Sequence, residues 1–285
     1  MARNRIKSVL RSILPGYQTL NLDVPVEMKP RFGHGHPPHP GLFEIISRNR
    51  EVYKEWLVKA MSHRESLLSI KNKIDTINLV EPVWNNGSIS ALDLIMLFTM
   101  IASGHPGTYI EIGSGYSTKT VFKAKRDYSL PTRIISIDRT ARPEIEKISD
   151  SVINEEFEKT DQSLFTSLKK GDIIFVNSSH RIFPNSDATV FFMEVLPYLP
   201  SGVKVHFHNV YLPYDYPQEM CDKYYSEQYG LAFFLMANPE KYKTIAPNYF
   251  ISEDEELKLL LKPFWEHSTM PELERHGSSF WIEIA

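Results

Sequence analysis

Short apolar runs alternate with amphipathic segments through the second half of the chain. Each run is rich in Ile, Val or aromatic residues, as strands buried in a parallel sheet are. We expect strands at Thr108–Ile112, Arg133–Ile137, Asp172–Val176 and Val203–Phe207, a weaker one near Glu155–Lys159, and a terminal one in SSFWIEIA. Helical segments lie between them, for example Ser117–Arg126 and Ala188–Leu196. This alternation predicts an α/β fold with helices on both faces of the sheet.

The pattern before the first strand is helical. A helical rhythm runs from Leu42 to about Lys73, and NNGS at 85–88 is a turn after which Ser88 or Ser90 caps the helix ISALDLIMLFTMIA. The Pro-rich and Gly-rich PRFGHGHPPHPG excludes a helix or a central strand. An acidic helix is expected around Glu253–Leu261. We therefore predict an N-terminal basic helix, Pro/His-rich segment and helical cap over 1–80, and an α/β domain over 81–285.

The first sixteen residues, MARNRIKSVLRSILPG, combine helical apolar spacing with a basic face. Packing on the chain's own domain or on a partner subunit, as in a homo-oligomer, is the favoured interpretation. Peripheral contact with an anionic membrane surface through residues 1–16 is the alternative. No apolar run is long enough for a transmembrane span.

Composition narrows the classes of function. The 285 residues carry a net charge of −3, and no basic stripe predicts nucleic-acid binding. The single cysteine, Cys221, excludes an internal disulfide framework and indicates a reducing, cytoplasmic location.

The most informative motif is EIGSGYST, in which an acid ends a strand and two glycines follow. A dinucleotide fingerprint requires a third glycine where Thr118 stands, so that motif does not match. Glu111 is placed to meet an ammonium group, and Asp138, at the end of the next strand, is placed to accept from ribose hydroxyls. Either acid alone could simply cap a turn or a helix. The pair favours a sulfonium nucleoside, S-adenosylmethionine.

The chain resembles the class I S-adenosylmethionine-dependent methyltransferases. The resemblance is carried by EIGSGYST and ISID, and extends through DIIFVNSSHR, SDATVFFMEVLPYLPSGVKVHFHNVYLPYDYP, EQYGLAFFL and GSSFW. It is greatest to bacterial small-molecule and sugar O-methyltransferases of the macrolide-sugar and cephalosporin-pathway type. It implies a doubly wound, mostly parallel, seven-stranded Rossmann-like sheet whose last strand, Phe280–Ile284, is antiparallel. The cofactor-binding residues that we predict are Glu111, Gly113, Ser114, Gly115, Ser117, Asp138, Asp161 and Asn177.

The resemblance also suggests the chemistry. His180, on the loop after the fourth main strand, corresponds to a general base, and an imidazole suits that task near neutral pH. Asn177 and the pair His208–Asn209 stand where the relatives hold Mg²⁺ with acids. Because Mg²⁺ prefers charged oxygen ligands, we expect no tightly bound metal, even if Asp215 contributed a carboxylate.

Three further expectations concern the remaining residues. The spacing of His34, His36 and His39 could suit a metal, but an irregular segment gives no fixed geometry, and the resemblance places it over the mouth of the site. Tyr211, in VYLPYDYP, could line an acceptor pocket or simply pack. His208, Asn209 and Tyr211 are the predicted substrate residues. The resulting hypothesis is an O-methyltransferase acting on a small hydroxylated acceptor, a sugar or cell-surface glycan precursor. The alternatives are a non-catalytic cofactor-binding descendant and a metal-dependent enzyme with altered ligands.

Overall fold

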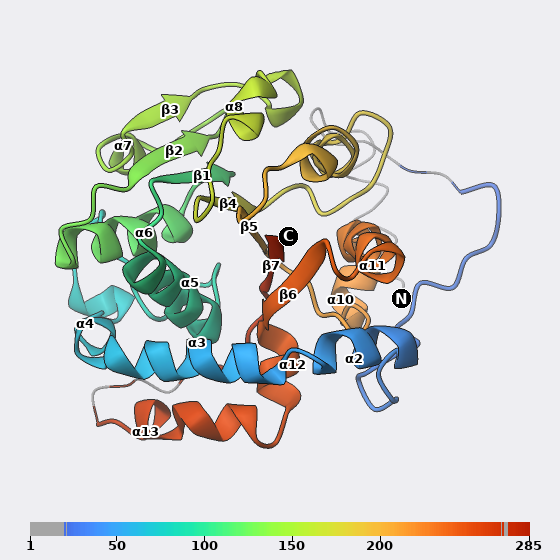
Figure 1. Cartoon of the computed structure of the whole chain (residues 1–285), viewed down its shortest axis with the longest axis horizontal. Helices are drawn as coiled ribbons and strands as arrows, with labels where there is room; N and C mark the ends of the chain where they lie inside the picture. The colour runs from blue at the N-terminus through green and yellow to red at the C-terminus, as the bar shows by residue number, and fades with distance from the viewer. Residues whose placement is uncertain (1–19, 21, 269, 271–272) are drawn as a thin grey trace.

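The computed structural model describes residues 20, 22–268, 270 and 273–285. The basic helix predicted at 1–16 lies outside the described residues. Figure 1 shows a central sheet with helices packed around it, and the described part of the N-terminal segment running along one side of the molecule.

The sheet has seven strands in the order β3-β2-β1-β4-β5-β7-β6. The first five pair in parallel, whereas β7 runs antiparallel to both β5 and β6. Their bounds are β1 (Thr108–Ile112), β2 (Arg133–Ile137), β3 (Ser151–Ile153), β4 (Ile173–Val176), β5 (Lys204–Phe207), β6 (Tyr242–Pro247) and β7 (Phe280–Ile284). The predicted doubly wound, mostly parallel sheet of seven strands, with its last strand antiparallel, is therefore confirmed.

The helices cover the sheet and the edge beside β6. They are α2 (Pro40–Ser47), α3 (Arg50–Ser62), α4 (Arg64–Leu68), α5 (Ala91–Gly104), α6 (Tyr116–Asp127), α7 (Pro143–Glu146), α8 (Ser163–Thr166), α9 (Asp187–Val190), α10 (Gln218–Cys221), α11 (Glu227–Ala237), α12 (Asn248–Glu253) and α13 (Lys262–Trp265). Helix α5 begins where the sequence predicts, because the Ser90 side chain accepts from the Asp93 amide as an N-cap. It packs between α6 and α3.

Several predicted elements are wrong in place or type. The third strand is Ser151–Ile153, a short edge strand paired with β2, and the predicted strand at Glu155–Lys159 contains a 3₁₀ turn instead. The long helix predicted from Leu42 is divided into α2, α3 and α4, and α2 starts at Pro40 with His39 as its N-cap. The sequence analysis did not predict β6.

Two other predicted helices are divided into pieces of different helical type. The segment predicted as the helix Ala188–Leu196 starts as α9, continues as a π-helix over Phe191–Val195 and closes with a 3₁₀ turn. The acidic segment near Glu253 contains the end of α12 and a 3₁₀ turn at Leu257–Leu261. In both, a break in the regular hydrogen-bond pattern separates short helical pieces that the sequence suggested as one.

A single cluster of buried apolar side chains runs from Leu42 to Ile284. Helices α2 and α3 therefore bury their apolar faces in the same core as the sheet. The predicted division of the chain into a cap over 1–80 and an α/β domain over 81–285 stays a prediction. Among the described residues, no helix is both long and apolar enough to cross a membrane.

Candidate functional site

The carboxyl ends of β1 and β4 and the residues after β5 enclose a small pocket. In an open α/β sheet this edge is where ligands bind. Five predicted residues line the pocket: Ser114, Gly115, Ser117, Asn177 and His208. The sequence analysis gave no site role to its other lining residues, which are Ser88, Ile89, Tyr116 and Phe175. The turn before α5 thus forms part of the wall.

Gly113 is required by the fold itself. Its φ is +80°, a conformation that glycine adopts readily, and a Cβ there would lie 2.8 Å from the Asn177 carbonyl oxygen. The amide of Asn177 in turn donates to the Ile112 carbonyl at 3.0 Å. The glycine therefore lets the ends of β1 and β4 meet closely, which brings Asn177 to the pocket.

Replacing Gly113 by alanine tests this close approach. Gly171 is a matched control, because its φ is +93° but a Cβ there meets nothing within 4 Å. We expect Gly171→Ala to cost about 1–2 kcal/mol from backbone strain alone, and Gly113→Ala to cost about 3 kcal/mol because a steric clash is added. Urea denaturation of both variants measures the difference, and equal costs would contradict the close approach.

Gly115 differs from Gly113. Its φ of 171° is ordinary extended backbone, and a Cβ there would meet only the Arg142 guanidinium, at 3.5 Å. The chain's own packing therefore does not demand a glycine here, although this residue lines the pocket. A small residue at this point leaves room for a ligand against the backbone. Arg142, which the sequence analysis missed, places a positive charge beside it.

Glu111 is fully buried, and its carboxylate is surrounded by hydroxyl donors. Ser136 donates at 2.6 Å, Ser117 at 2.9 Å and Tyr109 at 3.3 Å, and Thr118 also donates. Thr118 in turn accepts from the Gly115 amide at 3.0 Å. In this conformation Glu111 organises the glycine loop from beneath and does not line the pocket. Direct contact between Glu111 and an ammonium group stays a prediction.

The burial of Glu111 predicts a pH effect on stability. Burial raises the pKa of Glu111 from 4.5 to about 7, despite hydrogen bonds from Ser136, Thr118 and Ser117 that lower it. The folded chain then holds this proton over a range in which the unfolded chain has lost it. The resulting contribution to stability is complete below pH 4.5 and disappears as the pH rises through about 7.

We expect the free energy of unfolding of the wild type, relative to Glu111→Gln, to fall by about 3 kcal/mol between pH 4.5 and pH 8. Urea denaturation of both proteins at several pH values measures this difference. Taking the difference removes the contributions of other titrating groups. A constant difference over this range would show that the carboxyl titrates normally.

Asp138, directly after β2, holds the glycine loop from the side. Its Oδ2 accepts from the Ser114 amide at 3.1 Å and from the Ser114 hydroxyl at 2.5 Å, and Oδ1 accepts from the Thr140 amide at 2.9 Å. These hydrogen bonds, together with nearby Arg142, outweigh the opposing effect of burial and lower the pKa of Asp138. The side chain is an ionised, half-buried acceptor at the edge of the sheet.

Two other predicted residues do not line the pocket. Asp161 is exposed and accepts from the Ser163 amide at 2.9 Å, in the turn that leads into the short helix α8. Tyr211 is buried in an aromatic cluster with Tyr216 and Tyr249, and its amide donates to Gln228 at 2.9 Å. The packing role that the sequence left open for Tyr211 is therefore present.

His180 lies on the loop after β4 and is held on both ring nitrogens. Nδ1 is 2.7 Å from Glu227 Oε2, and Nε2 is 3.2 Å from Asn209 Nδ2. Its backbone is left-handed, with a φ of +59°. The structure thus brings His180 and Asn209 together and adds Glu227, which has no role in the predicted site.

His208 connects this group to the pocket. Its ring lies 6.3 Å from that of His180, centroid to centroid, and its Nδ1 is buried with no hydrogen-bond partner in the described structure. Burial lowers the pKa of His208 to about 4, although the nearby Asp93 carboxylate raises it. A neutral imidazole with an unpaired nitrogen therefore lines the pocket.

The donor set does not suit Mg²⁺, because Asn177, His208 and Asn209 carry no negative charge. Asp215 is already engaged: its Oδ2 accepts from the amides of Arg31 at 2.7 Å and Phe32 at 3.0 Å. Among the described residues, no group of three or more His, Cys, Asp or Glu side chains could hold a metal.

The Pro/His-rich segment has structural contacts of its own. His34 Nε2 is 2.9 Å from the Asp215 carbonyl oxygen, and His39 Nδ1 accepts from the Leu42 amide at 3.3 Å. A Cβ on Gly33 would lie 2.7 Å from Tyr214 Cβ. The segment is thus packed against the loop that follows β5. Asn209 and Tyr211 belong to the same loop.

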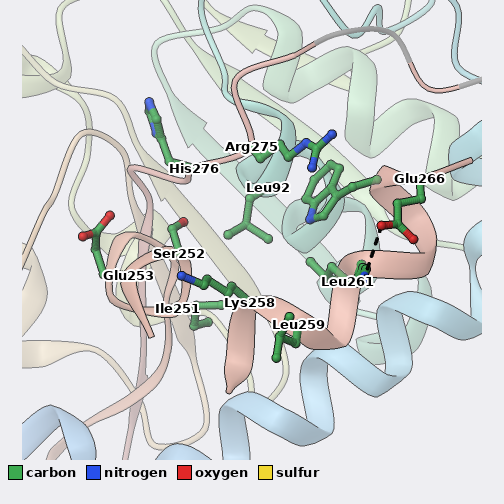
Figure 2. A pocket seen from close by; sticks show the side chains of 12 residues that line it. Leu92, Ile251, Ser252, Glu253, Lys258, Leu259, Leu261, Glu266, Arg275 and His276 are labelled. Carbon is green, nitrogen blue, oxygen red and sulfur yellow. Dashed lines mark ion pairs between the residues drawn. The ribbon is translucent and has the colours of Figure 1, made fainter. Parts of the chain in front are cut away.

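A larger cavity of about 340 Å³ lies elsewhere, between α12, α13 and the segment before β7 (Figure 2). None of the predicted site residues lines it. Its lysines already have partners, since Lys258 pairs with Glu255 at 2.7 Å and Lys262 with Glu266 at 3.6 Å. The smaller pocket at the sheet edge, where several polar groups converge, is the candidate site.

No protein-family model and no curated protein matches the chain. Among solved structures, it is similar to the S-adenosylhomocysteine-bound methyltransferase PaMTH1 of Podospora anserina, with 15% identity, 80% of this chain and 88% of that chain covered, and a TM-score of 0.41. It is also similar to an O-methyltransferase from Bacillus cereus in complex with S-adenosylhomocysteine, with 13% identity, coverage of 86% and 99%, and a TM-score of 0.41. A third is the C9 mutein of the Thermus thermophilus branched-chain polyamine synthase, with 11% identity, coverage of 79% and 63%, and a TM-score of 0.41. At these levels of identity the similarities do not establish an activity. The chemistry of the site has to be inferred from the residues of this chain.

Proposed function

We propose that the chain is an S-adenosylmethionine-dependent O-methyltransferase that acts on a small hydroxylated acceptor, with a sugar or cell-surface glycan precursor as the first substrate class. One observation carries the proposal. An imidazole held on both nitrogens, His180, lies beside a pocket built from the glycine loop and the ends of neighbouring parallel strands.

The residues in and beside the pocket carry groups that suit the cofactor, but the pocket holds only about 20 Å³ and would have to widen to admit it. Gly115 offers open backbone, Asp138 beside the pocket offers an ionised acceptor for ribose hydroxyls, and His208 lines the pocket as a neutral imidazole. Ser114, Ser117 and Asn177 complete the wall, and the Arg142 guanidinium suits a carboxylate. When bound, the cofactor supplies an electrophilic methyl group.

The chain's own part in the reaction is proton removal and positioning. His180 would accept the proton of the acceptor hydroxyl at Nε2, the nitrogen now contacted by the Asn209 amide. Asn209 would yield that position to the hydroxyl and orient it. Because Ser278 Oγ lies 3.4 Å from Asn209 Oδ1, the amide is held in place on its other side.

A second candidate is a non-catalytic binding protein. It is favoured by the near-complete burial of His180, which is 5% exposed, and by Asn177 and Asn209 in place of the acids of the relatives. A metal-dependent enzyme with altered ligands would instead lose activity in a chelator and recover it with one transition metal.

Calorimetric titration of the full chain with S-adenosylmethionine and S-adenosylhomocysteine tests the proposal, followed by transfer of a labelled methyl group to a panel of hydroxylated sugars. We expect Kd values between about 1 μM and 1 mM, abolished by Gly115→Val, which fills the pocket wall. Gly104→Val is the control, since a Cβ at Gly104 meets nothing within 4 Å. Absence of binding at millimolar concentration would refute the proposal, and binding without transfer would select the second candidate.

A further inference from the structure

Glu227 is the side chain that holds His180. It is the first residue of α11 and is fully buried. Its Oε2 lies 2.7 Å from His180 Nδ1, and its Oε1 accepts from the Ser178 hydroxyl at 2.8 Å. The start of a helix favours a carboxylate, because the unpaired amides there carry partial positive charge. Both carboxylate oxygens are therefore in use within the loop that carries His180.

The pattern of donors fixes the tautomer of His180. An ionised carboxylate can only accept, so Nδ1 carries the proton that lies between His180 and Glu227. Nε2 is then the nitrogen with the lone pair, and it accepts from the Asn209 amide at 3.2 Å. On its other side, Asn209 Oδ1 lies 3.4 Å from Ser278 Oγ, whose single hydroxyl hydrogen also has Asp93 Oδ2 within reach at 3.1 Å.

We propose that Glu227 is a positioning residue that keeps His180 in the Nδ1-protonated form and so makes Nε2 its basic atom. The catalytic meaning of this inference rests on the proposed function. Free imidazole exchanges between its two tautomers, and only the form held here presents a lone pair toward Asn209 and the pocket.

The loop also has hydrogen bonds that do not involve the Glu227 carboxylate. The His180 carbonyl accepts from the Ser226 amide at 2.8 Å and from the Glu227 amide at 3.3 Å. The His180 amide donates to Ser178 Oγ at 3.0 Å. Because these contacts involve backbone groups and Ser178, a change of the Glu227 side chain should alter the tautomer while the loop keeps its path.

Nitrogen-15 NMR of histidine-labelled protein reads the tautomer directly and needs no turnover. We expect the Nδ1-protonated pattern for His180 in the wild type at pH 8, and its loss in Glu227→Gln and in Glu227→Met, which removes the acceptor. Glu219→Gln is the control, because Glu219 is an exposed acid on α10 paired with Lys223. Circular dichroism shows which variants are folded. If Glu227→Met does not fold, Glu227→Gln alone is used for the test.

The kinetic test uses the same variants. In Glu227→Gln we expect kcat to fall about 10²-fold or more, with KM for the acceptor and Kd for S-adenosylhomocysteine within twofold of the wild type. Glu227→Asp should restore part of kcat. An unchanged His180 tautomer, or an unchanged kcat, would overturn the inference. A wild type that shows the tautomer but never transfers methyl would refute the proposed function and leave the positioning role of Glu227 standing.

Discussion

Replacing His180 by alanine is expected to lower kcat for methyl transfer by about 10²–10⁴-fold, the range supplied by a positioned general base. The imidazole contacts Glu227 and Asn209 through its two nitrogens, so its removal deletes the group that links them. Because His180 does not line the cofactor pocket, the Kd for S-adenosylhomocysteine should stay within twofold. Labelled methyl transfer and calorimetry measure the two quantities.

The control for this variant is His36→Ala, which removes an exposed histidine of the Pro/His-rich segment. It should transfer methyl at the wild-type rate. If His180→Ala were as active as the wild type, the base would have to be another group, and the neutral imidazole of His208 would be the next to test.

Replacing Asp93 by alanine is expected to lower the free energy of unfolding by about 3–5 kcal/mol, because several buried donors lose their acceptor. Asp93 lies in the first turn of α5 with no exposed surface. Its oxygens accept from the Ser278 amide at 2.9 Å, the Ser279 amide at 2.9 Å and the Asn248 side chain at 2.8 Å. This one carboxylate joins α5, α12 and the start of β7.

Urea denaturation measures the loss, with Ser90→Ala as the comparison. That change removes only the N-cap of the same helix and should cost about 1 kcal/mol. Activity of Asp93→Ala should also fall, since Ser278 supports Asn209. A cost as small as that of Ser90→Ala would mean that water replaces the carboxylate.

The central strands could be predicted from sequence because burial leaves a clear local signal. Strands β1, β2 and β7 match their expected bounds, since each is rich in Ile or aromatic residues and is buried in four of its five positions. The edge strand β3 has only three half-buried residues, SVI, and gives no such signal. The strand β6, YKTIAP, ends in proline and was missed, although only its second residue, Lys243, is exposed.

The site was predictable where its residues follow a strand directly. Asn177, His208 and Ser114 come from the loops after β4, β5 and β1, so topology alone brings them to one edge. Glu227 could not be found in this way, because it is 47 residues from His180. It begins the segment EQYGLAFFL, which the resemblance includes but to which it gives no site role. The role of Glu111 was also beyond the sequence, since only its burial shows that it holds the loop from below.

The firm packing of α3 in the core limits the movements by which a ligand could enter or leave. Its Tyr53 and Leu57 are buried in the core shared with the sheet, and Arg50 pairs with Asp254 and Glu256. Swinging this helix aside would expose all of that surface at once. The segment from Arg31 to His39, held on Asp215, and the loop after His180, held on Ser226, would break fewer contacts by moving. We therefore expect ligand exchange to break a few hydrogen bonds of these loops and to leave the helices in place.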